Sequence, residues 1–243
     1  MRQETVTAKL SGGTVAAEDL TLDAENKRRT VGVAAATGAA PSIAISGSAV
    51  VNVLTQTTSA EIDTPDLPLN VTQKITVEAT NEAIDRGQVG FVGGGSSFGL
   101  GVSAVALVDR RDTDALVTGV RQSVGAPRWD VSATNTGEAH ISVTSALASG
   151  SGDEDNDDSG GGNIAVNIPV SLALMRWNTR AVMSDTILLG AGRLDLIATE
   201  AGVVSNRQEA LTASGDHAGT VGVALTTYNS DVLAQMVDSN IEA

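Results

Sequence analysis

The densest group of possible metal ligands is an acidic, glycine-rich segment at residues 149–162, with the sequence SGSGDEDNDDSGGG. Carboxylates at Asp153, Asp155 and Asp157 alternate along it, as the oxygen ligands of a calcium loop do. An EF-hand loop needs Gly at its sixth position and Glu at its twelfth, and this segment has Asp and Ile there. We interpret it as a solvated insertion and expect no cofactor, with calcium binding by the three Asp residues as the alternative.

A second charged group, Asp109–Asp114 (DRRDTD), combines carboxylates with guanidinium groups. An enzyme that cleaves acidic polysaccharide would need a base and a pair of carboxylates facing one groove. The corresponding steps elsewhere in the chain read TQTTS, RWNTR and NSDVL, so the charges are not shared. We therefore predict variable surface turns and no enzymatic activity, with a carbohydrate-active enzyme as an alternative.

These predicted turns, at 109–114, 176–180 and 226–231, contain the residues that would contact a partner. The candidates are the charged and aromatic side chains Arg110, Arg111, Asp112, Arg176, Trp177, Arg180 and Tyr228. Trp177 is predicted to be exposed, where it could contact a protein or a sugar. Trp129 stands where the other repeats have Leu or Ile, so we predict that it fills the core.

Other possible cofactor motifs do not have the context they need. Gly99, Gly101 and Ala104 match the spacing GxGxxA, but the strand-like residues after them do not form the helix that a dinucleotide site requires. We expect these glycines to mark tight bends or close strand packing. The two histidines, His140 and His217, have no metal-ligand spacing, and the chain contains no Cys.

Alanine residues mark a repeat that positions all of these segments. Pentads of alternating apolar residues (LTLDA, ITVEA, WDVSA and LDLIA) end at Ala24, Ala79, Ala133 and Ala198. A β-branched run followed by a polar step ends at Ala60, Ala115, Ala181 and Ala234, and Ala8 fits as a fifth member. The first set precedes the second by 36 residues in three copies and by 48 in the third, which carries the acidic insertion.

The period is therefore about 54 residues, with four copies at approximately 9–60, 61–115, 116–181 and 182–234. Each copy contains strand-like alternation and turn residues, which predicts an all-β protein made of short strands. We predict a single parallel β-solenoid domain over residues 1–243. The intervals of 36 and about 18 residues favour coils of about 18 residues. A β-propeller with one blade per repeat is the alternative.

Composition limits the partners. The net charge is −14 and aromatic residues make up 2%, so the core must be built from Ala, Val, Ile and Leu. An acidic chain without basic blocks argues against nucleic acid and anionic membranes as partners. The first residues, Met1–Glu4, lack the apolar segment of a signal peptide, so we expect any export signal to lie outside this chain.

The repeats resemble those of giant secreted bacterial surface proteins, the filamentous-adhesin and leukotoxin-like family. The resemblance rests on GSAVVNVLTQTTSAEI (47–62), GVSAVALVDRRDTDALV (101–117) and the segments LTLDAEN, ITVEATN and WDVSATN. It implies a right-handed parallel β-helix that acts as a stalk or adhesive fibre at the cell surface. It implies no catalytic residues.

We therefore expect an extracellular structural protein that attaches to a host or neighbouring cell surface or to polysaccharide. Its turns would be presented at repeat spacing, so that weak contacts add up to avidity. Self-assembly through uncapped solenoid ends is the alternative. We expect no membrane insertion.

Overall fold

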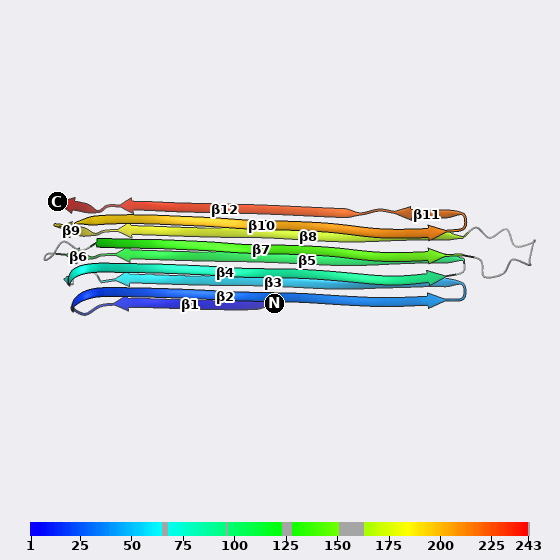
Figure 1. The fold of residues 1–243 in the computed structure, drawn as a ribbon, viewed down its shortest axis with the longest axis horizontal. Coiled ribbons are helices and arrows are strands. Elements are labelled where there is room, and N and C mark those ends of the chain that lie inside the picture. The colour runs from blue at the N-terminus through cyan, green and yellow to red at the C-terminus, as the bar shows by residue number, and fades with distance from the viewer. Residues whose placement is uncertain (65–67, 96, 123–127, 151–162, 243) are drawn as a thin grey trace, which may run out of the picture.

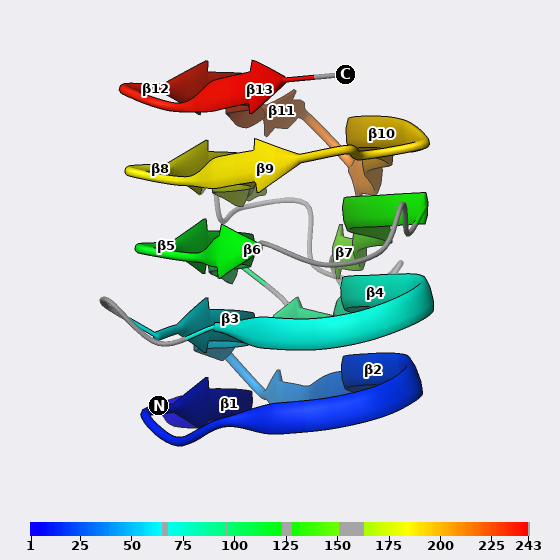
Figure 2. The ribbon, with the colours of Figure 1, turned by 90° about the vertical axis from the view of Figure 1, so that its left-hand side faces the viewer.

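A computed structural model describes residues 1–64, 68–95, 97–122, 128–150 and 163–242. Two long parallel sheets face each other, and a short third sheet joins them at one end (Figures 1 and 2). The predicted parallel β-solenoid is confirmed. The acidic insertion belongs to the third repeat, and Asp153, Asp155 and Asp157 lie outside the described residues.

Sheet A contains the second half of each repeat. Its strands are β1 (Arg2–Ser11), β3 (Ile43–Asp63), β5 (Phe98–Thr118), β8 (Ile164–Ser184), β11 (His217–Thr220) and β12 (Val223–Val237). Sheet B contains β2 (Val15–Ala40), β4 (Leu69–Gly95), β7 (Arg128–Ser149) and β10 (Arg193–Ser214). Sheet C contains β6 (Arg121–Gln122), β9 (Ile187–Leu189) and β13 (Asn240–Glu242).

Each repeat forms one coil, so the predicted coil of about 18 residues is wrong. The anchor alanines pair between neighbouring coils, and Ala60 lies beside both Ala8 and Ala115. Ala24 and Ala79 pair in the same way in sheet B. The chain crosses from sheet A to sheet B at one end and returns at the other end one level higher, so the winding is right-handed (Figure 2).

The anchor spacing has a simple cause in this flat coil. Ala24 and Ala60 belong to one buried core cluster near the sheet C end, although they lie in opposite sheets. The shorter interval runs around the nearby turn, and the interval of 36 residues runs out to the far turn and back. The two intervals therefore differ because the alanines lie closer to one turn of the coil than to the other.

The strands are far longer than the predicted short ones. β5 and β8 are 21 residues each and β4 is 27. The polar steps predicted to be turns lie inside β3, β5, β8 and β12. The actual turns at the sheet C end follow these strands, and Gly12 (φ 68°) and Gly119 (φ 70°) adopt left-handed backbone conformations there.

The interior alternates apolar and polar layers along the strands. The anchor alanines form the first apolar layer together with Trp129, which is fully buried as predicted. Asn81 and Asn135 pair in register in sheet B and form a buried polar row beside it. Beyond them lie an ion cluster and two further apolar layers.

Glycines allow the thin interior to accept a few large side chains. A Cβ atom on Gly101 would lie 1.8 Å from Cζ of Phe91, and one on Gly99 would lie 3.3 Å from Cδ1 of Leu147. These glycines therefore permit close packing between the sheets, as predicted, rather than marking bends.

Candidate functional site

The residues predicted to contact a partner lie in the middle of strands, so their predicted placement in turns is wrong. The strand alternation then divides them into two groups. Three of them point inward, as the anchor alanines do: Arg111, Trp177 and Tyr228. The other four point outward: Arg110, Asp112, Arg176 and Arg180. Arg111 and Trp177 lie inside the solenoid, Tyr228 packs beside them at the exposed end of the stack, and the second group forms part of the surface.

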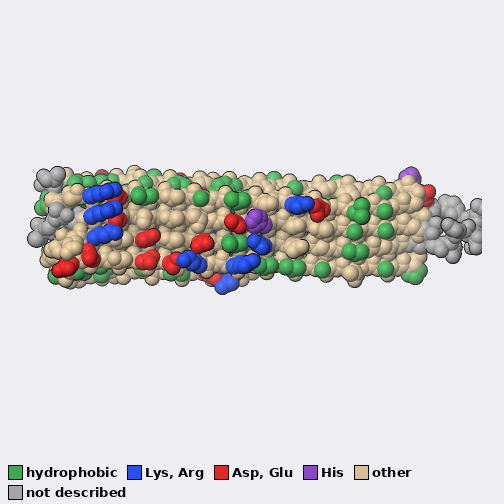
Figure 3. Space-filling model, in the orientation of Figure 1, with side chains coloured by type: hydrophobic (Ala, Val, Ile, Leu, Met, Phe, Trp, Pro, Cys, Tyr) green, Lys and Arg blue, Asp and Glu red, His purple; other side chains and the backbone are tan. Residues whose placement is uncertain are grey.

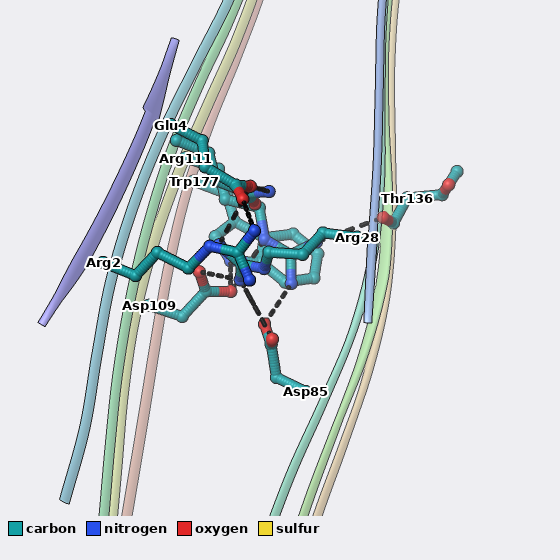
Figure 4. A network of polar contacts seen from close by, with 9 residues as sticks. Arg2, Glu4, Arg28, Asp85, Asp109, Arg111, Thr136 and Trp177 are labelled. Carbon is teal, nitrogen blue, oxygen red and sulfur yellow. Dashed lines mark hydrogen bonds and ion pairs between the residues drawn. The ribbon is translucent and has the colours of Figure 1, made fainter. Parts of the chain in front are cut away.

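Arg111 and Trp177 are fully buried, which also overturns the predicted exposure of Trp177. The Cζ atom of Arg111 lies 4.1 Å from the centroid of the Trp177 ring. This distance fits a cation–π interaction in a site removed from water. Figure 4 shows both side chains lying between the two sheets.

Asp109 connects this pair. The indole Nε1 of Trp177 donates a hydrogen bond to Asp109 Oδ2 at 3.1 Å. The same oxygen lies 2.7 Å from Nε of Arg111. Asp109 and Arg111 come from one strand, β5, and Trp177 comes from the next coil, so the contact joins two coils.

Asp85 of sheet B closes the cluster across the interior. It accepts hydrogen bonds from Arg28 at 2.8 and 2.9 Å and from NH2 of Arg111 at 3.1 Å. Arg111 also donates to the backbone carbonyl of Thr136 at 3.1 Å. We call Arg28, Asp85, Asp109 and Arg111 the buried ion cluster (Figure 4).

The cluster holds two guanidinium groups and two carboxylates, so its formal charges balance. Burial and the neighbouring Asp109 raise the pKa of Asp85 above its ordinary value, although Arg28 and Arg111 act in the opposite direction. Balanced, hydrogen-bonded charges can be held inside a protein, whereas a single unpaired charge would be strongly destabilising. The cluster therefore fixes the two sheets and successive coils relative to one another.

Tyr228 extends the cluster to the last coil. Its ring meets Trp177 edge to face, with centroids 5.2 Å apart, and its hydroxyl donates a hydrogen bond to Glu200. Thr179 Oγ1 donates to the other oxygen of Glu200 at 2.9 Å. Partial burial and the Glu200 carboxylate raise the pKa of Tyr228, so its hydroxyl stays protonated and donates.

The outward group forms ladders of side chains on sheet A. Asn178 donates to Asp112 at 2.6 Å, and Arg180 binds both oxygens of Asp114 at 2.7 and 2.9 Å. Each contact joins β5 to β8. Arg110 and Arg176 are exposed and pair in register, so they present two cations on neighbouring coils.

The outer face of sheet B carries most of its charged side chains toward the sheet C end and the middle, and hydrophobic ones toward the far end (Figure 3). Lys74 and Arg128 lie in register, and both bind Asp130, at 3.0 and 2.8 Å. Arg128 also reaches Asp195 of the next coil at 3.3 Å. This face therefore carries ladders of paired charges.

A surface depression of about 370 Å³ lies on the same face. Two carboxylates, Glu82 and Glu138, line it, and His140 lies 3.2 Å from Glu138. Neither carboxylate was among the residues predicted from the sequence.

Among the described residues, no three or more His, Asp or Glu side chains gather as metal ligands would. His217 lies in β11, far from His140 in β7. None of the described segments forms an apolar helix of the length that a membrane span requires.

Arg28 and Asp85 were not predicted from the sequence, because each differs from its counterparts in the other repeats. A signal was nevertheless present. Both lie an even number of residues after an anchor alanine, Ala24 or Ala79, and the strand alternation sends such positions inward.

Comparison with protein-family models, curated proteins and solved structures gives no match to this chain.

Proposed function

We propose that this chain is a structural and adhesive segment of an extracellular bacterial repeat protein, in which the solenoid carries surface ladders that attach to cells or polysaccharide. The observation that carries this proposal is the register. Ala8, Ala60, Ala115, Ala181 and Ala234 form one parallel ladder through every coil. Each coil of this kind contacts the next one along the stack, so the solenoid is extended by adding coils.

The outward ladders supply the attachment surface. Arg110 and Arg176 are one strand spacing apart, about 4.8 Å, and both are exposed. A polyanionic chain lying along the stack would meet both cations. Repeated weak contacts of this kind add up to avidity when the surface is multivalent.

The test is attachment of beads that display the purified chain to cells and to immobilised acidic polysaccharide. The variant Arg110→Ala/Arg176→Ala should lose most of the attachment. The control Arg86→Ala/Arg207→Ala removes the same charge from the exposed outer face of sheet B and should attach like the original chain. Equal loss in both variants, or no attachment by the original chain, would contradict the adhesive role.

A second candidate function is assembly of a filament from many copies. The terminal strands β1 and β2 at one end, and β10 and β12 at the other, each have one unpaired edge in the sheets. Such edges can pair with another chain. Electron microscopy of concentrated protein should then show filaments that grow along the stacking direction, and a strictly monomeric solution would contradict assembly.

A further inference from the structure

One half of the outer face of sheet A is apolar. We define the apolar face as the outward side chains of residues 43–53 on β3, 98–108 on β5 and 164–174 on β8. Every residue at these outward positions is apolar or Gly. Ile45 and Val51 of β3 are 71% and 66% exposed, and Val102 in the middle of the sheet is 39% exposed.

The inward side chains of the same segments are mixed, with the polar Ser103 and Asn167 fully buried beside apolar ones. Leu107 and Ala173 are fully buried against sheet B, and Met175 is nearly so. Polar residues therefore interrupt these runs, FGLGVSAVALV and IAVNIPVSLALM, only at inward positions. Runs of this kind are typical of parallel strands that are covered on both faces, whereas here only the inner face is covered.

Strand β7 of sheet B provides a contrast within the same molecule. Its outward positions from Arg128 to Thr144 are all charged or polar, and only Ala146 and Ala148 near its end are apolar. The low polarity of the apolar face therefore does not follow from the composition of the chain as a whole.

The size of the apolar face matches an interface between proteins. It spans 10 residue steps along the strands, or about 33 Å. It covers three strands, or about 14 Å, and with Val223 and Leu225 of β12 the area is roughly 500 Å². Two such faces in contact would bury about 1,000 Å², the lower limit for a specific interface.

We propose that a second copy of this chain packs on the apolar face, so that two solenoids join through their A sheets. A flat sheet is best covered by another flat apolar sheet at about 10 Å, and a second copy provides a surface of equal area and strand spacing. The contact would be isologous, with the same residues on both sides.

The charged ladder beside the apolar face selects the orientation of the two copies. Arg110 and Arg176 stand one outward step beyond Val108 and Leu174. A two-fold axis along the strands would bring the arginines of the two copies together, which is unfavourable. A two-fold axis along the stacking direction makes the strands of the copies antiparallel and leaves the arginines outside the contact.

The test begins with the mass in solution, measured by sedimentation equilibrium. The original chain should form a dimer, and Val51→Lys/Val102→Lys should weaken association by more than about a hundredfold because it buries unpaired charge. The control Val92→Lys/Val203→Lys places the same substitutions at exposed positions on sheet B and should leave the dimer intact.

Spin labels distinguish this dimer from other assemblies. The chain contains no Cys, so a single Cys can be labelled at Ala104 or at Phe98. In the antiparallel dimer the two labels at Ala104 lie close together, and those at Phe98 lie about 33 Å apart. A monomer at every concentration, association that survives Val51→Lys/Val102→Lys, or short distances at both positions would overturn the proposal. Binding of the apolar face to phosphatidylcholine vesicles in place of a second copy would also overturn it.

Discussion

Arg110 and Arg111 are neighbours in sequence and have opposite environments. Arg110 is exposed on sheet A, and Arg111 is fully buried between two carboxylates and an indole ring. Alternation along the strand creates the difference, since successive side chains point to opposite faces. This pair therefore allows the interior cluster to be tested against a control one residue away.

Arg111→Ala should lower the free energy of unfolding by about 3–5 kcal/mol, because it leaves Asp109 buried with a weaker partner. Arg28 remains, but its nearest approach to Asp109 is 3.6 Å. Arg110→Ala should change stability by less than about 0.5 kcal/mol. Urea unfolding of both variants measures these values, and similar losses would show that the cluster contributes little.

The raised pKa of Asp85 predicts that its contribution to stability changes with pH in the direction opposite to that of most carboxylates. Burial and Asp109 raise its pKa above 3.8, so the folded state binds this proton more tightly than the unfolded chain does. The stabilising contribution of Asp85 is therefore full below about pH 3.9 and is lost as the pH rises through the folded pKa.

Carboxyl NMR titration measures this shift, with Asp130 as the internal control. Burial opposes the ionisation of Asp130, but Lys74 and Arg128 outweigh it and lower its pKa below 3.8. The contribution of Asp130 to stability is therefore lost as the pH falls. We expect Asp85 to titrate at the higher pH of the two, and the reverse order would contradict the assignment.

The cluster residues show what the sequence could and could not provide. Counting in steps of two from Ala115 and Ala181 places Arg111 and Trp177 inside the solenoid. The strand alternation could therefore have been followed in the sequence up to these residues. It is a stronger guide here than the general expectation that charged residues lie in turns. The partner Asp85 could not be identified, because contact across the interior depends on how far each strand runs before it turns.

Strand length is the feature at the scale of elements that differs most from expectation. Polar steps such as TQTTS normally indicate turns, but in β3 they lie within a strand of 21 residues. Their outward members face water and their inward members form buried polar layers with the opposite sheet. A chain can therefore continue as a strand through a polar segment when its outward side chains face water and its inward ones join a buried polar layer.

The close approach of the two sheets at Gly101 gives a prediction for these elements. Gly101→Ala places a methyl group within 1.8 Å of Cζ of Phe91 and should cost about 1–3 kcal/mol. Adding Phe91→Leu should recover part of that loss, because the two sites share one space. Thermal unfolding of the single and double variants measures the coupling.

Gly219→Ala is the matched control, because a Cβ atom there has no atom within 4 Å. It should leave the unfolding temperature almost unchanged. Strictly additive losses for Gly101→Ala and Phe91→Leu would mean that the sheets do not pack closely at this point.

At the scale of the whole molecule, the described chain is a slab whose longest dimension follows the strands (Figure 1). Each repeat adds one strand spacing, about 4.8 Å, in the stacking direction. The sequence predicted the class of fold, the period and the alanine ladders, because identical residues in register repeat with every coil. It did not fix the number of residues per coil, since the same two intervals fit three short coils or one long coil.

The two outer faces also differ at this scale. The outer face of sheet B mixes charged and apolar side chains, and one half of sheet A is apolar over roughly 500 Å². The adhesive surface and the surface for a second copy would therefore occupy neighbouring halves of one sheet. Dimerisation would leave Arg110 and Arg176 accessible, so the two proposals can be tested separately.

The measurement that tests the central claim most directly is the distance between two spin labels in a monomer. Thr55 and Arg110 are register partners on neighbouring coils, so labels there should show strong dipolar broadening. Labels at Thr55 and Lys74 would be close if a coil held about 18 residues. One coil per repeat predicts broadening for the first pair only, with the second pair on opposite outer faces. Broadening for the second pair and none for the first would contradict it.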